Sequence, residues 1–239
     1  MAITTPSYKI QIITNPDDLH SWTAAQFSSF VGTGNVLHDT LFPPATLPTP
    51  AQLDLAAARH VSSFKEDSEH NVFIQIVDSE NRKIMGGAKW QFWPSDPHRP
   101  LKVPVDYIDT STPQGKAEQA FAQKVMDEFM GRRARDMAMP HGLLDLCYCV
   151  PKHERKGVAS ALVAWGLERC DREGWVAFTE ASPRGWPVYE RLGFEKREVV
   201  RLRFDDLIGD DEGALDLQKY AKGMRDVVWT YMVRPARRR

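Results

Sequence analysis

Residues 143–181 read LLDLCYCVPKHERKGVASALVAWGLERCDREGWVAFTEA and divide into three parts. The first part, 143–150, is a nearly uncharged run that stops at a proline, as a buried strand would. After a polar loop, apolar residues at 157–170 spread over one side of a predicted helix, which Gly174 caps. A second apolar strand is predicted at 175–181. This order predicts a βαβ crossover, with two parallel or splayed strands.

Hydrophobic periodicity extends the alternation of strands and helices to both sides. Further strands are predicted at 9–13, 71–77, 83–92, 194–202 and 227–233, and further helices at 15–30, 51–67, 115–137 and 186–192. Two stretches rich in proline, 32–50 and 94–115, are predicted to be loops, and 94–140 is interpreted as an insertion. We detect no second core, so the prediction is a single α/β domain over 1–239.

Composition excludes several classes of protein. The 239 residues carry 31 Lys+Arg against 32 Asp+Glu, with 42% hydrophobic residues, which are ordinary globular values. A dedicated nucleic-acid binder would usually be basic, so no nucleic-acid partner is expected. The last six residues include the arginines 234 and 237–239, which are predicted to form a solvated end.

Apolar runs, the first residues and the cysteines bear on the cellular location and on whether a metal site is expected. No apolar run is long enough to span a membrane, and the first residues lack the pattern of a secretion signal. The three cysteines are too few for a disulfide framework, and we expect a reducing cytoplasm. Cys147 and Cys149 lie within one predicted strand, which is no chelating turn, so no metal site is expected.

The loop from Val150 to Ser160 joins the end of a predicted strand to the start of a helix. Helix N-termini leave backbone N–H groups unpaired and carry a partial positive charge. Gly157 and Ala159 are small enough to let a ligand approach the backbone closely. Such a turn suits a diphosphate. The alternative is an ordinary polar loop that water caps.

This loop resembles a known signature. Residues 155–159, Arg-Lys-Gly-Val-Ala, resemble the acetyl-CoA signature of the GNAT superfamily of N-acetyltransferases, commonly written Gln/Arg-x-x-Gly-x-Gly/Ala. Glu154 occupies the first position of that pattern and departs from it, and Arg155 can supply the positive charge instead. The backbone role of the loop does not depend on the side chain at this position.

The flanking segments agree with the resemblance, which covers about 143–195. Residues 146–151 resemble the family's fourth strand with its following proline, and 189–194 resemble its Tyr-x-x-x-Gly-Phe closing motif. Residues 180–183, with Gly185, are similar to many fungal-type small-molecule members. The resemblance implies a mixed, mostly antiparallel sheet with a splayed parallel pair at the acetyl-CoA site and helices on both faces.

The resemblance also implies where acetyl-CoA binds. The splayed strand leaves backbone groups free for the pantetheine arm, and the N–H groups of 155–160 hold the diphosphate. The implied cofactor-binding residues are Cys147, Tyr148, Cys149, Val150, Arg155, Lys156, Gly157, Val158, Ala159, Ser160 and Ser182.

Three catalytic candidates follow. Tyr189 stands where the family commonly has a tyrosine that serves the leaving CoA thiolate, although a tyrosine in such a helix is otherwise usually core packing. Asp145 is predicted to alternate with Cys147 and Cys149 on one face, where relatives often place a base. Glu180 is the competing base, and water is a third possibility. Each carboxylate has an alternative interpretation as a structural residue, such as an Asp bonded to an arginine.

The predicted function is direct transfer of an acetyl group from acetyl-CoA to the amine of a small molecule or amino-acid-like acceptor. The alternatives are O-acetyl transfer on the same fold and a non-catalytic CoA-binding sensor. An acyl-enzyme on a cysteine is disfavoured, because a thiol in an apolar strand is inert. The acceptor pocket is expected to involve the 94–137 region and nearby aromatics, namely Trp90, Trp93, Tyr107 and Trp186. No membrane partner is expected, and the oligomeric state is left open.

Overall fold

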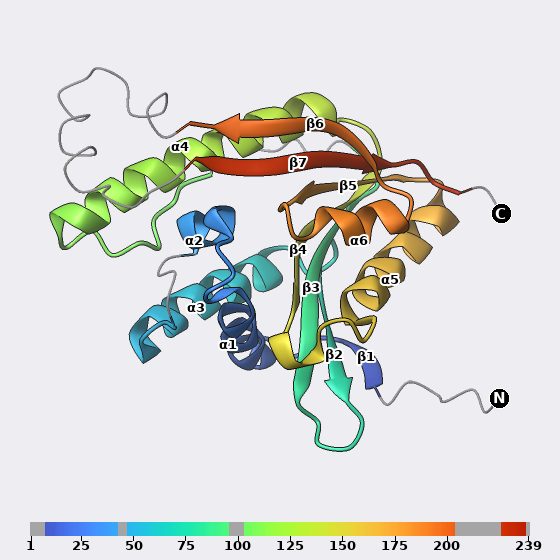
Figure 1. Ribbon diagram of the computed structural model, residues 1–239, viewed down its shortest axis with the longest axis horizontal. Helices are drawn as coiled ribbons and strands as arrows, with labels where there is room; N and C mark the ends of the chain where they lie inside the picture. The colour runs from blue at the N-terminus through green and yellow to red at the C-terminus, as the bar shows by residue number, and fades with distance from the viewer. Residues whose placement is uncertain (1–7, 43–46, 96–102, 204–225, 238–239) are drawn as a thin grey trace.

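The computed structural model describes residues 8–42, 47–95, 103–203 and 226–237 (Figure 1). Within them the strands are β1 (Tyr8–Ile12), β2 (Asn71–Asp78), β3 (Ile84–Trp93), β4 (His141–Cys149), β5 (Val176–Ala181), β6 (Glu195–Leu202) and β7 (Val227–Arg234). The helices are α1 (Asp18–Phe30), α2 (Val36–Leu41), α3 (Pro50–Glu66), α4 (Pro113–Asp136), α5 (Val158–Glu173) and α6 (Trp186–Arg191), with a short 3₁₀ turn at Pro151–His153.

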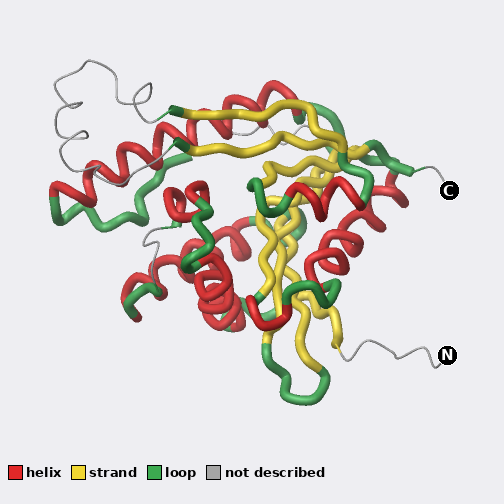
Figure 2. The backbone as a smooth tube through the Cα atoms, in the orientation of Figure 1, coloured by secondary structure: helices red, strands yellow, loops and turns green. Residues whose placement is uncertain are grey.

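The described strands form one mixed sheet in the order β1-β2-β3-β4-β5-β7-β6. All neighbouring pairs are antiparallel except β4 and β5, which run parallel. Helices α5 and α6 cover one face, whereas α1 and α3 cover the other face over β1–β4, and α4 covers it over β7 and β6 (Figures 1 and 2). This architecture confirms the predicted fold class, including the βαβ crossover.

Local capping explains why two of the predicted helices begin where they do. The Thr49 side chain accepts a hydrogen bond from the Gln52 N–H, and the Gln52 side chain accepts one from the Thr49 N–H, which is a capping box at the start of α3. The Thr112 hydroxyl accepts from the Gly115 N–H at 3.0 Å and starts α4.

The prediction of a loop throughout 32–50 is wrong, because it contains α2. The Asn35 side chain caps this helix by accepting from the His38 N–H at 3.3 Å. The His38 ring stacks between Phe30 and Phe42, with ring centroids 4.0 and 5.2 Å away. These tertiary contacts stabilise six residues that have too little periodicity to be recognised as a helix. Residues 43–46 lie outside the described part of the chain.

The arginine-rich end is also not simply solvated. Arg234 is 3% exposed, and its guanidinium makes a bidentate pair with Asp171 at 2.8 and 2.9 Å. Its Nε donates to the Leu192 carbonyl at 3.0 Å, and the Arg237 N–H donates to Asp171 at 2.7 Å. Residues 238–239 lie outside the described part. The prediction is therefore wrong for Arg234, which ties β7 to the end of α5.

Residues 103–112 of the proline-rich 94–115 stretch run along α4. The Gln123 side chain donates to the Val103 carbonyl at 2.9 Å and accepts from the Val105 N–H at 2.8 Å. Gln119 donates to the Val105 carbonyl at 2.7 Å. This segment has no strand or helix until α4 begins at Pro113, as predicted for a loop; residues 96–102 lie outside the described part.

The packing of α5 on the sheet depends on a glycine in the middle of the helix. A Cβ atom at Gly166 would collide with the indole ring of Trp90, which is fully buried and donates from Nε1 to the Leu162 carbonyl at 3.3 Å. Trp90 therefore belongs to the core between β3 and α5. Its predicted place in an acceptor pocket is wrong.

Two helix-interior glycines provide a matched test of this packing. Gly131 in α4 is exposed, and no atom lies within 4 Å of the point that a Cβ atom would occupy there. Alanine favours helix over glycine by about 0.8–1 kcal/mol, so Gly131→Ala should leave stability unchanged or raise it by up to that amount. Gly166→Ala should instead lower the free energy of unfolding by about 1–3 kcal/mol, because the core must shift. Urea denaturation of both variants measures the difference, and equal effects would refute this role of Gly166.

Candidate active site

The central feature of the site is the divergence of two neighbouring strands. β4 and β5 pair only from His141↔Val176 to Leu144↔Thr179, although β4 continues to Cys149. We call the point just beyond Leu144 and Thr179 the fork. The predicted splay is confirmed by this register. Beyond the fork, the backbone N–H and C=O groups on the β5 side of β4 have no paired residues on β5.

A β-bulge lies at the fork. Adjacent residues of β3 pair with Leu144 and Leu146, so Asp145 is an extra residue that has no partner on β3. A bulge of this kind bends the strand and increases its twist, which is consistent with β4 turning away from β5 at this point.

The bulge reverses the alternation of side chains along β4. Cys147 and Cys149 pack with the cluster between the sheet and α5. Asp145 instead forms ion pairs with Lys89 and Arg133 on the opposite face, where α4 lies. The prediction that Asp145 shares a face with the two cysteines is therefore wrong, because one inserted residue breaks the period of two.

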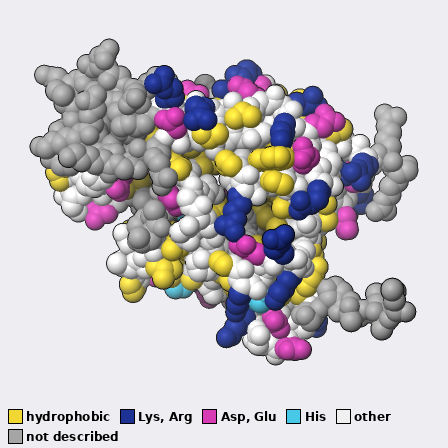
Figure 3. All heavy atoms as spheres, in the orientation of Figure 1, with side chains coloured by type: hydrophobic (Ala, Val, Ile, Leu, Met, Phe, Trp, Pro, Cys, Tyr) yellow, Lys and Arg dark blue, Asp and Glu magenta, His cyan; other side chains and the backbone are white. Residues whose placement is uncertain are grey.

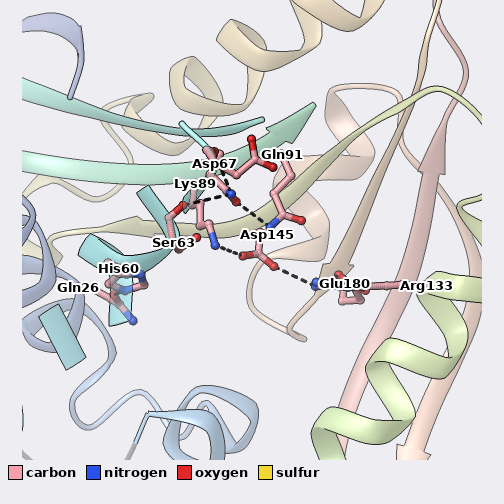
Figure 4. Close-up of polar contacts among 10 residues, drawn as sticks. Gln26, His60, Ser63, Asp67, Lys89, Gln91, Arg133, Asp145 and Glu180 are labelled. Carbon is pink, nitrogen blue, oxygen red and sulfur yellow. Dashed lines mark hydrogen bonds and ion pairs between the residues drawn. The ribbon is translucent and has the colours of Figure 1, made fainter. Parts of the chain in front are cut away.

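Both candidate bases belong to a largely buried chain of four charges (Figure 4). The Arg133 guanidinium bonds Glu180 through Nε at 2.8 Å and through Nη2 at 3.0 Å, and Nη2 also bonds Asp145 at 3.0 Å. The Lys89 ammonium lies 3.2 Å from the second oxygen of Asp145. An aspartate bonded to an arginine was the structural alternative for Asp145, and this contact is present.

The ion pairs determine the protonation of Asp145. Burial alone would raise its pKa, but the charges and hydrogen bonds of Lys89 and Arg133 outweigh burial and hold the pKa well below its usual range. Burial lowers the pKa of Lys89, and the attraction to Asp145 partly opposes this shift. Asp145 is therefore ionised at neutral pH, and its low pKa makes it a weak proton acceptor.

A cavity of about 570 Å³ opens at the fork, between the end of α1 and the start of α5. In Figure 3, Lys and Arg side chains surround a hollow near the middle of the face. The predicted site residues that line the cavity are Tyr189, Cys147, Tyr148, Cys149, Arg155, Gly157, Ala159, Ser160 and Ser182. The predicted residues that are not in its lining are Asp145, Glu180, Val150, Lys156 and Val158.

Three of the predicted residues have partners inside the protein, through a side chain or through a backbone N–H. The Tyr148 hydroxyl donates to the Trp22 carbonyl at 2.9 Å, so its side chain points into the core beneath α1. The Val150 N–H donates to the Met85 carbonyl at 2.9 Å. Val158 is 1% exposed, and its side chain packs within the α5 cluster.

The loop before α5 and the first residues of the helix line the cavity at Arg155, Gly157, Ala159 and Ser160. Arg155 and Gly157 both adopt the left-handed conformation, with φ of 61° and 81°. The first bond across the start of the helix runs from the Ala161 N–H to the Gly157 carbonyl at 2.9 Å, so the amides of 158–160 precede the intrahelical ladder. Unpaired amides and the positive end of the helix dipole form a site for an anion.

Glu154, the residue that departs from the family pattern, has a partner across the cavity. Its carboxylate bonds the Arg184 guanidinium at 2.7 Å, and both side chains line the cavity. Arg184 follows β5 and Arg191 lies on α6, so cations from two further segments border the cavity beside Arg155. Neither Arg184 nor Arg191 was predicted from the sequence, because their position depends on how α6 folds back over the fork.

Tyr189 lies on α6, is largely buried and lines the cavity. Gly185 lies against its ring, since a Cβ atom at Gly185 would be 3.1 Å from a ring carbon. Burial raises the pKa of Tyr189 well above its ordinary value, so the hydroxyl stays protonated at neutral pH and can donate a hydrogen bond. Burial also raises the pKa of Cys147 to about 12 and that of Cys149 to about 11, which makes both thiols poor nucleophiles.

The remaining aromatics expected around an acceptor have other partners. Trp93 stacks on His70 with ring centroids 4.5 Å apart. Tyr107 lies under the Arg59 guanidinium at 3.9 Å, and the Lys196 ammonium lies 3.2 Å from the centre of a Trp186 ring. None of them lines the cavity just described. On that side its lining comes from the end of α1 and the following turn, namely Ser29, Phe30, Thr33, Gly34 and Asn35.

Neither a membrane-spanning helix nor a metal centre occurs among the described residues. No described helix is long and apolar enough to cross a membrane. Within the same residues, no group of three His, Cys, Asp or Glu side chains could hold a metal ion.

Comparison with known proteins agrees with this geometry. The model of the acetyltransferase (GNAT) family matches residues 46–194, which include β2 to α6 and the whole fork. The predicted fungal-type character is not tested by this match and stays a prediction.

Solved structures share the fold at low identity. Arylalkylamine N-acetyltransferase 2 from Aedes aegypti is 12% identical, with 96% of this chain and 99% of that chain covered and a TM-score of 0.59. Polyamine N-acetyltransferase from Drosophila melanogaster is 10% identical, with coverages of 95% and 99% and a TM-score of 0.59. The protein yncA from Salmonella typhimurium, solved with its cofactor acetyl-CoA, is 11% identical, with coverages of 98% and 96% and a TM-score of 0.54.

Proposed function

Since the chain belongs to the acetyltransferase (GNAT) family, which uses acetyl-CoA, we propose that it transfers an acetyl group directly to the amine of a small molecule or amino-acid-like acceptor. The observation that carries the proposal is the fork, which opens into a cavity bordered by the free amides of the α5 N-terminus. The backbone of β4 could pair with an extended arm, and the amides at the start of α5 could bind a diphosphate of the same ligand.

In this proposal the pantetheine arm pairs with the backbone of Cys147–Cys149, as a short added strand. The amides of 155–160 hold the diphosphate, and Arg155, Lys156 and Arg184 add charge-assisted hydrogen bonds. Glu154 then competes with the phosphates for Arg184, to which it is paired at 2.7 Å. Ser182 closes the turn beside the arm, where its hydroxyl accepts from the Gly185 N–H at 3.2 Å.

Tyr189 is proposed to serve the leaving CoA thiolate by donating its hydroxyl proton or a hydrogen bond. A backbone N–H near Cys149 would stabilise the oxyanion that forms on the acetyl carbonyl. For the proton that the amine must lose, Asp145, Glu180 and water remain the candidates. The ion pairs around Arg133 disfavour Asp145, and neither carboxylate lines the described cavity. These contacts favour water as the immediate proton acceptor.

Two alternatives remain on the same fold, namely O-acetyl transfer and a CoA-binding sensor without catalysis. Structural neighbours that act on arylalkylamines and polyamines favour an amine acceptor. The position of Tyr189 in the cavity lining favours catalysis over sensing, because its hydroxyl could donate to a leaving thiolate.

The first test is acetyl-CoA turnover, followed by release of free CoA thiol, against arylalkylamines, polyamines, amino acids, aminoglycosides and peptides. We expect release that depends on the acceptor and follows sequential kinetics, since no thiol of the fork is reactive at neutral pH. Matched alcohols, such as 2-phenylethanol beside 2-phenylethylamine, distinguish N- from O-transfer. Ping-pong kinetics would contradict direct transfer. A thermal shift with CoA but no turnover favours the sensor. The absence of both a thermal shift and turnover would remove the assignment.

Two glycines at opposite ends of α5 test the diphosphate site. Gly157 and Gly174 are both left-handed, with φ of 81° and 73°, and both have open space at the Cβ position. Alanine at either position should cost about 1–2 kcal/mol of stability. Gly157→Ala should also weaken CoA binding about tenfold or more, because it displaces amides that contact the phosphates. Calorimetric titration with CoA checks this, and a similar loss of affinity in Gly174→Ala would contradict a local role.

Tyr189→Phe tests the proposed acid. The ring and its packing against Gly185 remain, so acetyl-CoA affinity should change little. Turnover should fall at least several-fold, because the variant loses general acid catalysis by the hydroxyl. Steady-state kinetics with a saturating acceptor separates kcat from KM. Unchanged kcat would remove Tyr189 from the mechanism.

A further inference from the structure

The fork divides the sheet into two halves. β1–β4 form one half and β5, β7 and β6 form the other, and the backbone ladder between them consists of the four residue pairs that end at Leu144↔Thr179. The Thr179 hydroxyl adds one bond to the Leu144 carbonyl at 3.1 Å. Asp145 and Glu180 are the next residues on the two strands. Both carboxylates therefore lie where the separation of the strands begins.

One side chain joins these two carboxylates. Arg133 bonds Glu180 through two nitrogens, at 2.8 and 3.0 Å, and reaches Asp145 at 3.0 Å with one of them. Arg133 comes from α4, which packs on the half that contains β7, where Phe129 stacks on Trp229 with centroids 4.3 Å apart. The guanidinium thus extends from one half of the sheet to the first separated residue of the other (Figure 4).

The burial of these charges requires an explanation. The exposed fractions of the side chains are 11% for Lys89, 12% for Arg133, 22% for Asp145 and 6% for Glu180. The two positive and two negative charges balance. Buried ion pairs of this kind often stabilise a fold no better than apolar residues of similar volume would. Their fixed geometry is the property that apolar residues would not supply.

We propose that Arg133 is a positioning residue that sets the separation of β4 and β5 at the fork, and thereby the width of the slot that receives the pantetheine arm. The inference rests on the proposed function, because the width matters only if the arm pairs with β4. A guanidinium is planar and presents its donors at fixed angles, so it holds two carboxylates at a defined spacing. Without it, two like charges would face each other at the point where no backbone ladder restrains the strands.

The test separates the arm of CoA from its phosphates. Calorimetric titration is carried out with CoA and with adenosine 3′-phosphate 5′-diphosphate, a fragment that keeps the phosphates but lacks the arm. The ratio of the two affinities reports the contribution of the arm. Arg133→Met should weaken CoA binding about tenfold or more and change fragment binding by less than about twofold, so the ratio falls. A general loss of structure would instead weaken both probes.

Two further variants make the test decisive. Arg133→Lys keeps the positive charge but cannot bond both carboxylates with the same geometry, so the ratio should fall here too, even if Arg133→Met does not fold. Arg132→Met is the matched control, because Arg132 lies on the same helix and pairs with Glu198 of β6 at 2.6 Å, away from the fork. Its ratio should equal that of the wild type.

An unchanged ratio in both Arg133 variants, or equal weakening of both probes, would overturn the inference while leaving the proposed function intact. Wild-type protein that binds neither probe would overturn the proposed function, and this inference with it. The outcomes are therefore distinguishable.

Discussion

A backbone N–H or C=O group inside a sheet needs a partner, and β4 loses its partner strand on one side just beyond Leu144. The strand must still extend for several residues to deliver the chain to the loop before α5. Its free backbone groups can be satisfied by water or by an extended ligand. The extra residue at Asp145 bends β4 at the fork, and β4 pairs with β3 again from Leu146 onward.

The start of α5 supplies a second set of unpaired groups close to the first. Gly157 turns the chain in a left-handed conformation at the start of the helix, and Gly157, Ala159 and Ser160 line the cavity. One ligand that is extended at one end and anionic at the other can satisfy both sets at once. A long arm joined to a diphosphate has this chemistry, and the geometry of the fork and the identity of the family lead to the same cosubstrate.

Much of this arrangement could be predicted from local sequence, because periodicity and capping act over a few residues. The strands and long helices follow from such patterns, and Gly174 ends α5 as expected. The bulge at Asp145 could not be predicted, since one inserted residue changes the face of a side chain without changing the composition of the strand. The same holds for α2, which depends on the stacking of His38, and for Arg133, whose partners are distant in the chain.

The bulge and the ion pairs together change how the two carboxylates should be understood. A carboxylate that two cations hold in one orientation is stabilised as an anion, and each increment of that stabilisation makes it a weaker base. Asp145 cannot therefore be both a strong proton acceptor and a fixed support of the fork. Its ion pairs with Lys89 and Arg133 favour the second role. In the proposed mechanism, proton removal from an acceptor amine would then fall to groups on the open side of the fork, where water can reach, and the ion pairs would serve to hold the shape of the slot.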